Sequence, residues 1–456
     1  MNCQTRIRRP FRWLRPPIHW GRGALAGVIR HPLHALLVGG LVCVTCLGLI
    51  ILGLHLWAGY HFRSARTCVA KYHDAEALEH LQACLHVWPQ DPESLLLAAR
   101  AARRLGRYAD AELFQERYEN ARGEDDILTL EGMLLRAERG EVDAASTFCQ
   151  ILVSRDHPDT PLILEAQARA YLAQLRLHDA AACLKKWRDR QPDNPQAYFL
   201  QARLDEQTVN PSQAIAHFRR VVELDPTHEE ARKRLAAHLL DMSQGAEALR
   251  HLDYLLEQHP DDPVLQVLRA RCLAQLRQPA RAEQILEEVL ARDPHQADAL
   301  ALRGRLALDH GQTKAAESWL RQAAALKPAD FAVHHQLQRA LKRNGKDEAA
   351  RKLQKQLKQM EDDMRRIHEI ATRQMQATPH NPALHYEVAM IALRAGATEE
   401  GVRWLHSALR ENPRYGPAHR ALALYYRQIG SPGRAAEHLK WAKGPVRAGS
   451  AGLETK

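Results

Sequence analysis

The stretch "VVELDPTHEEARKRLAAHLL", residues 221–240, places Pro226 between two runs of residues that favour helix. A proline inside a helix costs about 3 kcal/mol, because it lacks an N–H group and its ring clashes with the preceding turn. Pro226 therefore ends one helix and lets another begin a few residues later. The same arrangement occurs in "EQHPDDPVLQVL" (257–268) and in "LARDPHQADAL" (290–300).

Prolines of this kind recur with a fixed period. Six of them follow one another at intervals of 34 residues: Pro158, Pro192, Pro226, Pro260, Pro294 and Pro328. Pro379 and Pro413 are again 34 residues apart. Self-similarity with a period of 20–50 residues indicates a repeat architecture.

Small residues keep the same period. If Glu229 is position 1 of a repeat, positions 8 and 20 are small and position 24 is large and apolar. Four successive repeats have Ala202, Ala236, Ala270 and Gly304 at position 8, Ala214, Ala248, Ala282 and Ala316 at position 20, and Phe218, Leu252, Leu286 and Leu320 at position 24. Such spacing lets two antiparallel helices approach closely, while the large residue fills the gap to the next pair.

This pattern resembles the tetratricopeptide repeat, a 34-residue helix–turn–helix with A-x3-F and a late proline. Repeats then begin near 58, 92, 126, 161, 195, 229, 263, 297, 331, 382 and 416. The resemblance implies an all-α, right-handed α-solenoid of about eleven repeats. No repeat carries the full W-x2-LG-x2-Y block, and the repeat at 331 has Gln338 and Gln354 where Ala and Phe are expected.

A membrane-spanning helix is predicted ahead of the repeats. Residues 35–54, "ALLVGGLVCVTCLGLIILGL", contain no charge, and 20 helical residues cross a hydrocarbon core of about 30 Å. Trp57 and Tyr60 lie where interfacial aromatic residues are expected. A cleaved signal peptide and a buried soluble helix are the alternatives. A signal peptide has an apolar region of only about 7–15 residues after a short basic start.

The arginines before this segment predict its orientation. Seven precede it, with no acidic residue before Asp74: Arg6, Arg8, Arg9, Arg12, Arg15, Arg22 and Arg30. Arg63, Arg66 and Lys71 follow it. The positive-inside rule then predicts a single-pass inner-membrane protein with a cytoplasmic N-terminus and extracytoplasmic, periplasmic repeats.

The basic tail also accounts for most of the net charge, +7 of the formal +10. The tail interleaves arginine with aromatic residues in "RIRRPFRWLRPPIHW" (6–20), which suggests either RNA or anionic lipid headgroups. We favour lipid and predict no nucleic-acid partner.

The predicted organisation has six parts. They are a basic cytoplasmic tail (1–32), a transmembrane helix (33–57) that contacts lipid, a repeat array (58–343), a long inserted helix (344–381), C-terminal repeats (382–449) and a tail (450–456). The insertion carries apolar residues at alternating intervals of four and three: Leu353, Leu357, Met360, Met364 and Ile367. This stripe predicts either a homodimer through 346–375 or a helix that lies along the solenoid and bridges to the repeat at 382.

Catalytic and metal-binding motifs are absent from the sequence. The C-x2-C pair Cys43 and Cys46 lies inside the predicted span, and no second pair has zinc spacing. We therefore predict no enzyme activity, no metal and no cofactor. Cys68 and Cys84 are expected on the two helices of the first repeat, either as a disulfide or as two buried thiols.

The resemblance implies that positions 2, 5, 9, 12 and 13 of each repeat face a concave groove. Position 9 is arginine in six of the eleven repeats: Arg100, Arg169, Arg203, Arg271, Arg305 and Arg339. The planar guanidinium suits carboxylates, so these residues predict a groove for acidic peptide segments of other proteins. In the alternative interpretation, each arginine pairs with a glutamate of the next repeat.

The sequence therefore predicts a membrane-anchored scaffold that assembles partner proteins at the membrane through an arginine-lined concave groove. Two alternatives stay open. One is a cytoplasm-facing adaptor that regulates an envelope biosynthesis enzyme. The other is an accessory subunit of a polysaccharide synthesis, export or glycosyltransferase system.

Overall fold

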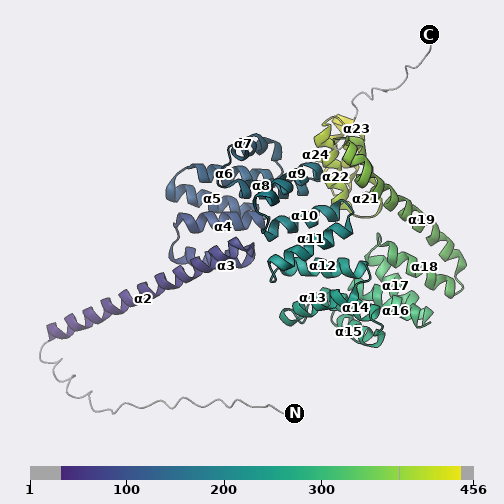
Figure 1. The fold of residues 1–456 in the computed structure, drawn as a ribbon, viewed down its shortest axis with the longest axis horizontal. Helices are drawn as coiled ribbons and strands as arrows, with labels where there is room; N and C mark the ends of the chain where they lie inside the picture. Colours follow the sequence, from purple (N-terminus) through teal and green to yellow (C-terminus); the bar gives the residue numbers. More distant parts are fainter. Residues whose placement is uncertain (1–31, 379, 443–456) are drawn as a thin grey trace, which may run out of the picture. The chain divides into compact units, whose positions relative to one another are not determined.

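Every element of the computed structural model is a helix, over the described residues 32–378 and 380–442 (Figure 1). The chain divides into a first unit, Met1–Thr129, and a second unit, Leu130–Lys456. The first unit contains α2 (Pro32–Ala70), α3 (Asp74–Val87), α4 (Pro92–Arg104) and α5 (Tyr108–Arg122). The predicted tail 450–456 and the predicted tail 1–32, apart from Pro32, lie outside the described residues.

The second unit holds most of α6 (Asp126–Glu138) and all the helices that follow. These are α7 (Val142–Ser154), α8 (Thr160–Ala173), α9 (Leu177–Arg190), α10 (Pro195–Gln207), α11 (Pro211–Leu224), α12 (Glu229–Asp241), α13 (Gly245–Gln258), α14 (Pro263–Gln275), α15 (Pro279–Arg292), α16 (Ala297–Asp309), α17 (Thr313–Leu326), α18 (Phe331–Arg343), α19 (Asp347–Glu369), a π-helix (Ile370–Gln374), α20 (Met375–Ala377), α21 (Pro382–Arg394), α22 (Thr398–Glu411), α23 (Gly416–Gln428) and α24 (Pro432–Ala442). Counted from the second half of α2 and α3, the order gives eleven helix pairs, so the all-α repeat fold is confirmed.

Helices begin two or three residues after the recurring prolines. Near Pro260, the side chain of Asp262 accepts hydrogen bonds from the N–H groups of Val264 (2.7 Å) and Leu265 (3.2 Å), and Pro263 is the first residue of α14. A side-chain cap satisfies N–H groups that have no partner in the helix, and proline is tolerated in the first turn. Asn194 and Asn381 cap α10 and α21 in the same way, each followed by a proline.

The small residues lie where the two helices of a pair touch. Ala202, Ala236 and Ala270 at position 8 are fully buried, as are the alanines at position 20. Two helices approach very closely at Gly304 of α16, where an added Cβ would lie 2.6 Å from Cγ of Leu320 on α17. Any other residue at that position would force the Leu320 side chain to move.

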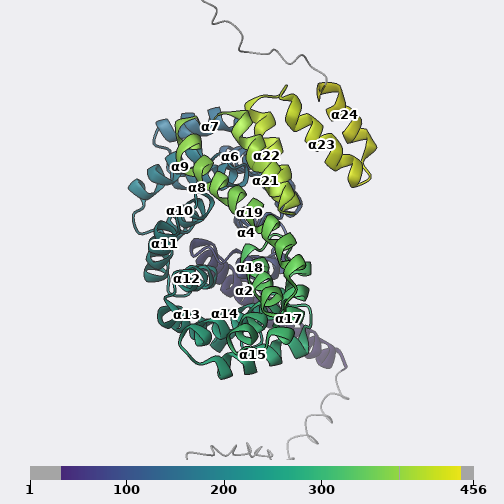
Figure 2. The same ribbon diagram turned by 90° about the vertical axis from the view of Figure 1, so that its right-hand side faces the viewer.

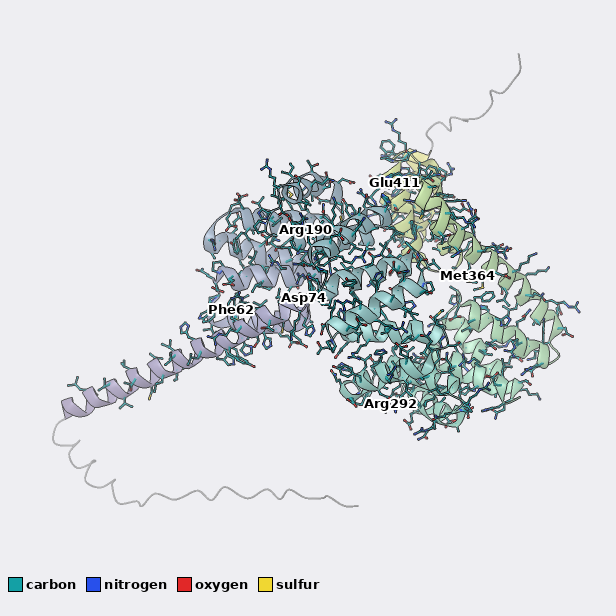
Figure 3. The ribbon with its side chains drawn as sticks, in the orientation of Figure 1. Phe62, Asp74, Arg190, Arg292, Met364 and Glu411 are labelled. Carbon is teal, nitrogen blue, oxygen red and sulfur yellow. The ribbon has the colours of Figure 1, made fainter. Side chains whose placement is uncertain are left out.

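The insertion lengthens the second helix of the repeat at 331. α19 has 23 residues, whereas α17 has 14. Leu353 and Leu357 are buried against α18, and Ile370 just beyond α19 is buried in the core of α21 and α22. Met364 lies on the open middle of α19 and is 47% exposed (Figure 3).

α19 is thus the bridge to the repeat at 382. Arg366 near its end holds Glu387 of α21 through two contacts of 2.6 and 2.7 Å. Gln338, which departs from the repeat pattern, is buried within α18. A homodimer through 346–375 stays a prediction, since half of its apolar stripe is used within the chain.

Among the described residues, one helix, over Gly39–Ala70, is long and apolar enough to cross a membrane. A signal sequence near an N-terminus can also meet this criterion of length and hydropathy. The helix shows no break at the predicted boundary between 57 and 58, because α2 runs on to Ala70 as the first helix of the first pair. The predicted domain boundaries stay predictions.

Glu317 joins two neighbouring repeats at the turn between α18 and α19. Its carboxylate, 7% exposed, accepts hydrogen bonds from Lys346 (2.8 Å), Asn344 (2.8 Å) and Arg321 (2.9 Å). Burial by itself would raise the pKa of Glu317, but these hydrogen bonds outweigh it and lower the pKa to about 2. The ionised form is therefore stabilised in the folded state.

We expect Glu317→Gln to lower the melting temperature at pH 7. An unfolded glutamate titrates near pH 4.5, so the carboxylate stabilises the fold above that pH and loses its effect as the pH falls towards 2. The difference between the wild type and the variant should then shrink over this range in thermal unfolding followed by circular dichroism. The control is Glu257→Gln, which changes an exposed side chain of α13. A difference that does not vary with pH would contradict the assignment.

Candidate functional site

The first helices of successive pairs carry the predicted arginines. α8 contacts α10, and α12, α14, α16 and α18 follow one another in contact. Five half-buried arginines lie on these helices and form what we call the arginine face: Arg169, Arg203, Arg271, Arg305 and Arg339. Neighbouring members affect one another electrostatically, Arg169 with Arg203 and Arg271 with Arg305. The sixth predicted residue, Arg100, is half-buried on α4 of the first unit.

Three members of the arginine face are paired with acidic residues. Arg169 lies 3.5 Å from the buried carboxylate of Glu138. Arg203 lies 3.3 Å from Glu206. Arg271 lies 2.7 Å from Asp241. Glu138 and Asp241 belong to the preceding repeat, so the acid comes from the opposite direction to the one that the sequence alternative assumed.

Glu206 is the centre of a larger charged network. It also accepts hydrogen bonds from Arg234 (3.0 Å) and His238 (2.8 Å) of α12. Burial alone would raise the pKa of Glu206, but the hydrogen bond from His238 and the charge of Arg234 outweigh it, so the pKa lies below its usual value. The arginine face is therefore neutralised from α8 to α14 by carboxylates of the same chain.

The α16–α18 end of the face is different. Within the described residues, neither Arg305 nor Arg339 has a carboxylate within 4.0 Å, and Arg339 donates only to Gln336 (3.0 Å). Burial and the charge of Arg271 lower the pKa of Arg305, and Asp309 opposes them. α18 contains no acidic residue. A partly desolvated guanidinium beside a second positive charge is costly, and an incoming carboxylate would relieve that cost.

A second feature, which the sequence did not suggest, links helices far apart in the chain. The backbone carbonyl of Gln174, in the turn between α8 and α9, accepts hydrogen bonds from Ser407 (3.4 Å) and from Arg410 of α22. We call this contact of Gln174 and Leu175 with Ser407 and Arg410 the clasp. Figure 2 shows α21 and α22 beside α8 and α9, where α19 has carried the chain back.

The clasp has an apolar component. Leu175, in a left-handed conformation with φ of 60°, is only 7% exposed and is buried in one core with Trp404 and Leu405 of α22. Val209, Ser243 and Arg277 have the same left-handed conformation at the equivalent turns of the following repeats, so this conformation belongs to the repeat turn and not to the clasp. Burial and the nearby charge of Arg176 lower the pKa of Arg410, and the charges of Glu411 and Asp143 oppose this shift.

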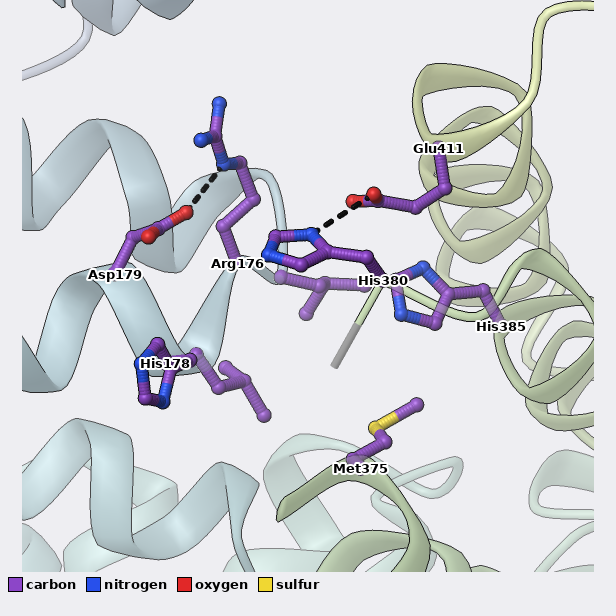
Figure 4. A pocket seen from close by; sticks show the side chains of 9 residues that line it. Arg176, His178, Asp179, Met375, His380, His385 and Glu411 are labelled. Carbon is purple, nitrogen blue, oxygen red and sulfur yellow. Dashed lines mark hydrogen bonds and ion pairs between the residues drawn. The ribbon is translucent and has the colours of Figure 1, made fainter. Parts of the chain in front are cut away.

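A small cavity of about 40 Å³ lies beside the clasp (Figure 4). Arg176 pairs with Asp179 (2.8 Å) on one wall, and His380 pairs with Glu411 (3.0 Å) on the other. The volume suits a few water molecules rather than a metabolite. In the part of the chain that the structure describes, no group of three or more His, Cys, Asp or Glu residues is arranged to hold a metal ion.

The described cysteines are free thiols. Cys84 donates to the carbonyl of Ala58 (3.3 Å), and Cys68 faces Glu76 (3.8 Å). Burial raises the pKa of Cys84 to about 11, so it stays protonated at neutral pH. The sequence left open whether Cys68 and Cys84 form a disulfide, and in the structure they do not.

We expect Arg410→Gln to loosen the clasp without unfolding the repeats. A hydrogen bond from a charged donor contributes about 1.5–3 kcal/mol, so amide hydrogen exchange of residues 174–178 should become roughly tenfold faster or more. Arg414→Gln, on an exposed side chain of the following turn, is the matched control. Unchanged exchange at 174–178 in the Arg410 variant would show that the hydrogen bonds do not hold the clasp.

Known proteins resemble this chain in fold. None of the curated proteins compared with it matches. Similar solved structures include a human IFIT1 dimer with m7Gppp-AAAA (17% identity, 77% of this chain and 89% of that chain, TM-score 0.37), a tetratricopeptide repeat protein from Parabacteroides merdae (18%, 63% and 99%, 0.32) and the type IV pilus biogenesis factor PilW (20%, 43% and 92%, 0.37). At these scores the likeness supports no inference about function.

Family models match the repeats themselves. Two models described as tetratricopeptide repeat match residues 75–126 and 165–229, and residues 239–306. These segments coincide with helix pairs of both units and with the period of the prolines. Repeats of this kind are scaffolds for protein–protein interaction. The chain is therefore a tetratricopeptide repeat protein.

Proposed function

We propose that this protein is a membrane-anchored scaffold that binds acidic segments of partner proteins on its arginine face. The observation that carries the proposal is the uneven charge of that face. Arg169, Arg203 and Arg271 already have carboxylate partners, while Arg305 and Arg339 have none within 4.0 Å in the described residues. A partner carboxylate would therefore be recognised between α14 and α18.

The arginine fork supports this assignment. A guanidinium binds a carboxylate through two parallel hydrogen bonds, and such charge-assisted bonds are about twice as strong as neutral ones. Lys342, exposed on the last turn of α18, adds a flexible positive charge. Several acidic side chains of one partner segment could thus each bind a different positive side chain of this surface.

We propose protein rather than nucleic acid as the partner. A phosphate backbone needs a continuous row of positive charges, because its affinity comes from neutralising many phosphates together. Here Glu138, Glu206 and Asp241 interrupt that row. An acidic peptide needs only the α16–α18 end, so the interruption favours it.

The proposed anchor is the apolar part of α2, with the N-terminus in the cytoplasm and the repeats outside it. The length and hydropathy of the helix and the seven arginines before it support this arrangement. No enzymatic step is part of the proposal.

The double variant Arg305→Gln and Arg339→Gln tests the binding face. We expect a fluorescent decapeptide rich in Asp and Glu to bind the full-length protein in detergent at least about tenfold more weakly, since each lost ionic hydrogen bond contributes about 1.5–3 kcal/mol. Fluorescence anisotropy at two salt concentrations measures this.

The control is a double variant with the same change in net charge, but its two changed residues lie on the second helices of their pairs. Arg250→Gln and Arg281→Gln change exposed side chains of α13 and α15 and should leave affinity within twofold. Equal losses in the two double variants would contradict the proposed face. Tighter binding of a single-stranded RNA than of the peptide would contradict the choice of partner.

Reporter fusions test the anchor and its orientation. A C-terminal alkaline phosphatase, active only outside the cytoplasm, should be active, and a C-terminal green fluorescent protein should stay dark if exported unfolded. Both fusions should remain in the membrane pellet after alkaline extraction with an intact N-terminus. An active fusion released as a shortened, soluble protein would instead identify a cleaved signal sequence.

A further inference from the structure

The environment of α2 changes abruptly at Ala58. Every described side chain from residue 36 to residue 57 is exposed, although most are apolar. From Ala58 onward one face of the helix is buried, with Ala58 and Ala65 fully covered and Val69 7% exposed, because α3 packs there. The same rigid helix is therefore apolar and bare on one side of residue 58 and part of the first repeat on the other.

Trp88 reaches back across this point. It lies in the turn between α3 and α4, and its Nε1 donates a hydrogen bond of 2.6 Å to Nδ1 of His55. Its ring also lies over Gly59, where an added Cβ would be 3.8 Å from Cη2 of Trp88. Cys84, one turn earlier in α3, contacts the carbonyl of Ala58 (3.3 Å). The turn is therefore level with residues 55–59 of α2.

This level coincides with the end of the uncharged segment. Residues 35–54 span about 30 Å at 1.5 Å per residue, which is the thickness of the hydrocarbon core. His55 is the next residue. The headgroup layer on each side is about 5–8 Å thick, so a side chain bonded to His55 lies within it. Trp57 and Tyr60, 45% and 64% exposed, lie in the same layer.

The residues of the turn suit that layer. Indole combines an apolar ring with one N–H donor, and tryptophan is enriched at membrane interfaces for this reason. Pro89 and Gln90 are exposed and uncharged. The one acid of the turn, Asp91, accepts a hydrogen bond from the N–H of Ser94 (2.9 Å) as the cap of α4.

We propose that the turn Trp88–Pro92 is a membrane-contacting surface and that its partner is the phospholipid headgroup layer. The inference rests on the proposed anchoring of α2 and goes beyond it. The first repeat does not hang from a flexible linker but sits on the bilayer, held by Trp88, Trp57 and Tyr60. The height of the first unit above the membrane is thereby fixed.

The test uses the full-length protein labelled with 5-fluorotryptophan in phospholipid nanodiscs. Fluorine NMR resonances of Trp57, Trp88 and Trp187 are assigned by loss of one peak in each Trp→Phe variant. A shallow spin-labelled lipid (5-doxyl phosphatidylcholine) and a soluble gadolinium chelate are the probes. We expect the shallow lipid to broaden Trp57 and Trp88 strongly and to leave Trp187, which is 1% exposed in α9, sharp.

Two other results would distinguish a failure of the proposed membrane contact of the turn from a failure of the proposed anchoring of α2. If Trp57 is broadened by lipid while Trp88 is broadened only by the chelate, the helix is anchored and the turn does not touch the membrane, which overturns the inference alone. If the shallow lipid broadens neither residue, the proposed anchoring fails as well.

A matched pair of variants tests the geometry. Gly59→Leu would place a side chain where the Trp88 ring lies and lift the turn away from α2. Gly53→Leu changes the same helix at a position with no atom within 4 Å of an added Cβ. We expect the first variant to reduce the lipid broadening of Trp88 by at least half and the second to leave it unchanged. Equal broadening of the Trp88 resonance in both variants would contradict the proposed position of Trp88 against α2.

Discussion

The structure depends on how closely two helices can approach at a small side chain. Alanine or glycine at positions 8 and 20 lets the helices of a pair touch, and a large residue at position 24 closes the gap to the next pair. At Gly304 even one added carbon atom would collide with the side chain of Leu320. Because each pair contacts mainly its neighbours, the same requirement returns every 34 residues along most of the chain.

The clasp is a described contact between repeats that are not neighbours in the chain. It joins Gln174 to Arg410, 236 residues away. The lengthened α19 makes it feasible, because nine additional residues (23 − 14) carry the chain about 14 Å further before α21 begins. The insertion therefore has a structural consequence: it brings two segments of the second unit together that five repeats separate.

Charge on the arginine face follows from the same architecture. First helices lie next to one another, so residues about 30 positions apart meet, as Arg271 and Asp241 do. Each carboxylate placed there removes one arginine from the set that a partner can use. The face is consequently divided into a part whose arginines have carboxylate partners and a part with Arg305 and Arg339, for which we propose an outside anion as the partner.

Much of this could be predicted from the sequence because it is local and periodic. The prolines, the alanines at positions 8 and 20, the helix caps at Asp262 and Asn194 and the uncharged run 35–54 each act within one or two helical turns. The arginine positions could also be listed, but not their partners. An acid at position 13 precedes Arg169, Arg271 and Arg339, yet it forms a pair within 4.0 Å only with the first two. Side-chain direction decided this, and the repeat pattern does not contain it.

The clasp and the contact of Trp88 with His55 were decided by tertiary structure alone. Both depend on where a helix of a given length ends in space, and no spacing of residue types encodes that position. The sequence by itself determined the repeating unit and its period. The path of the stacked repeats determined which distant turns meet, because small rotations between neighbours add up over many repeats.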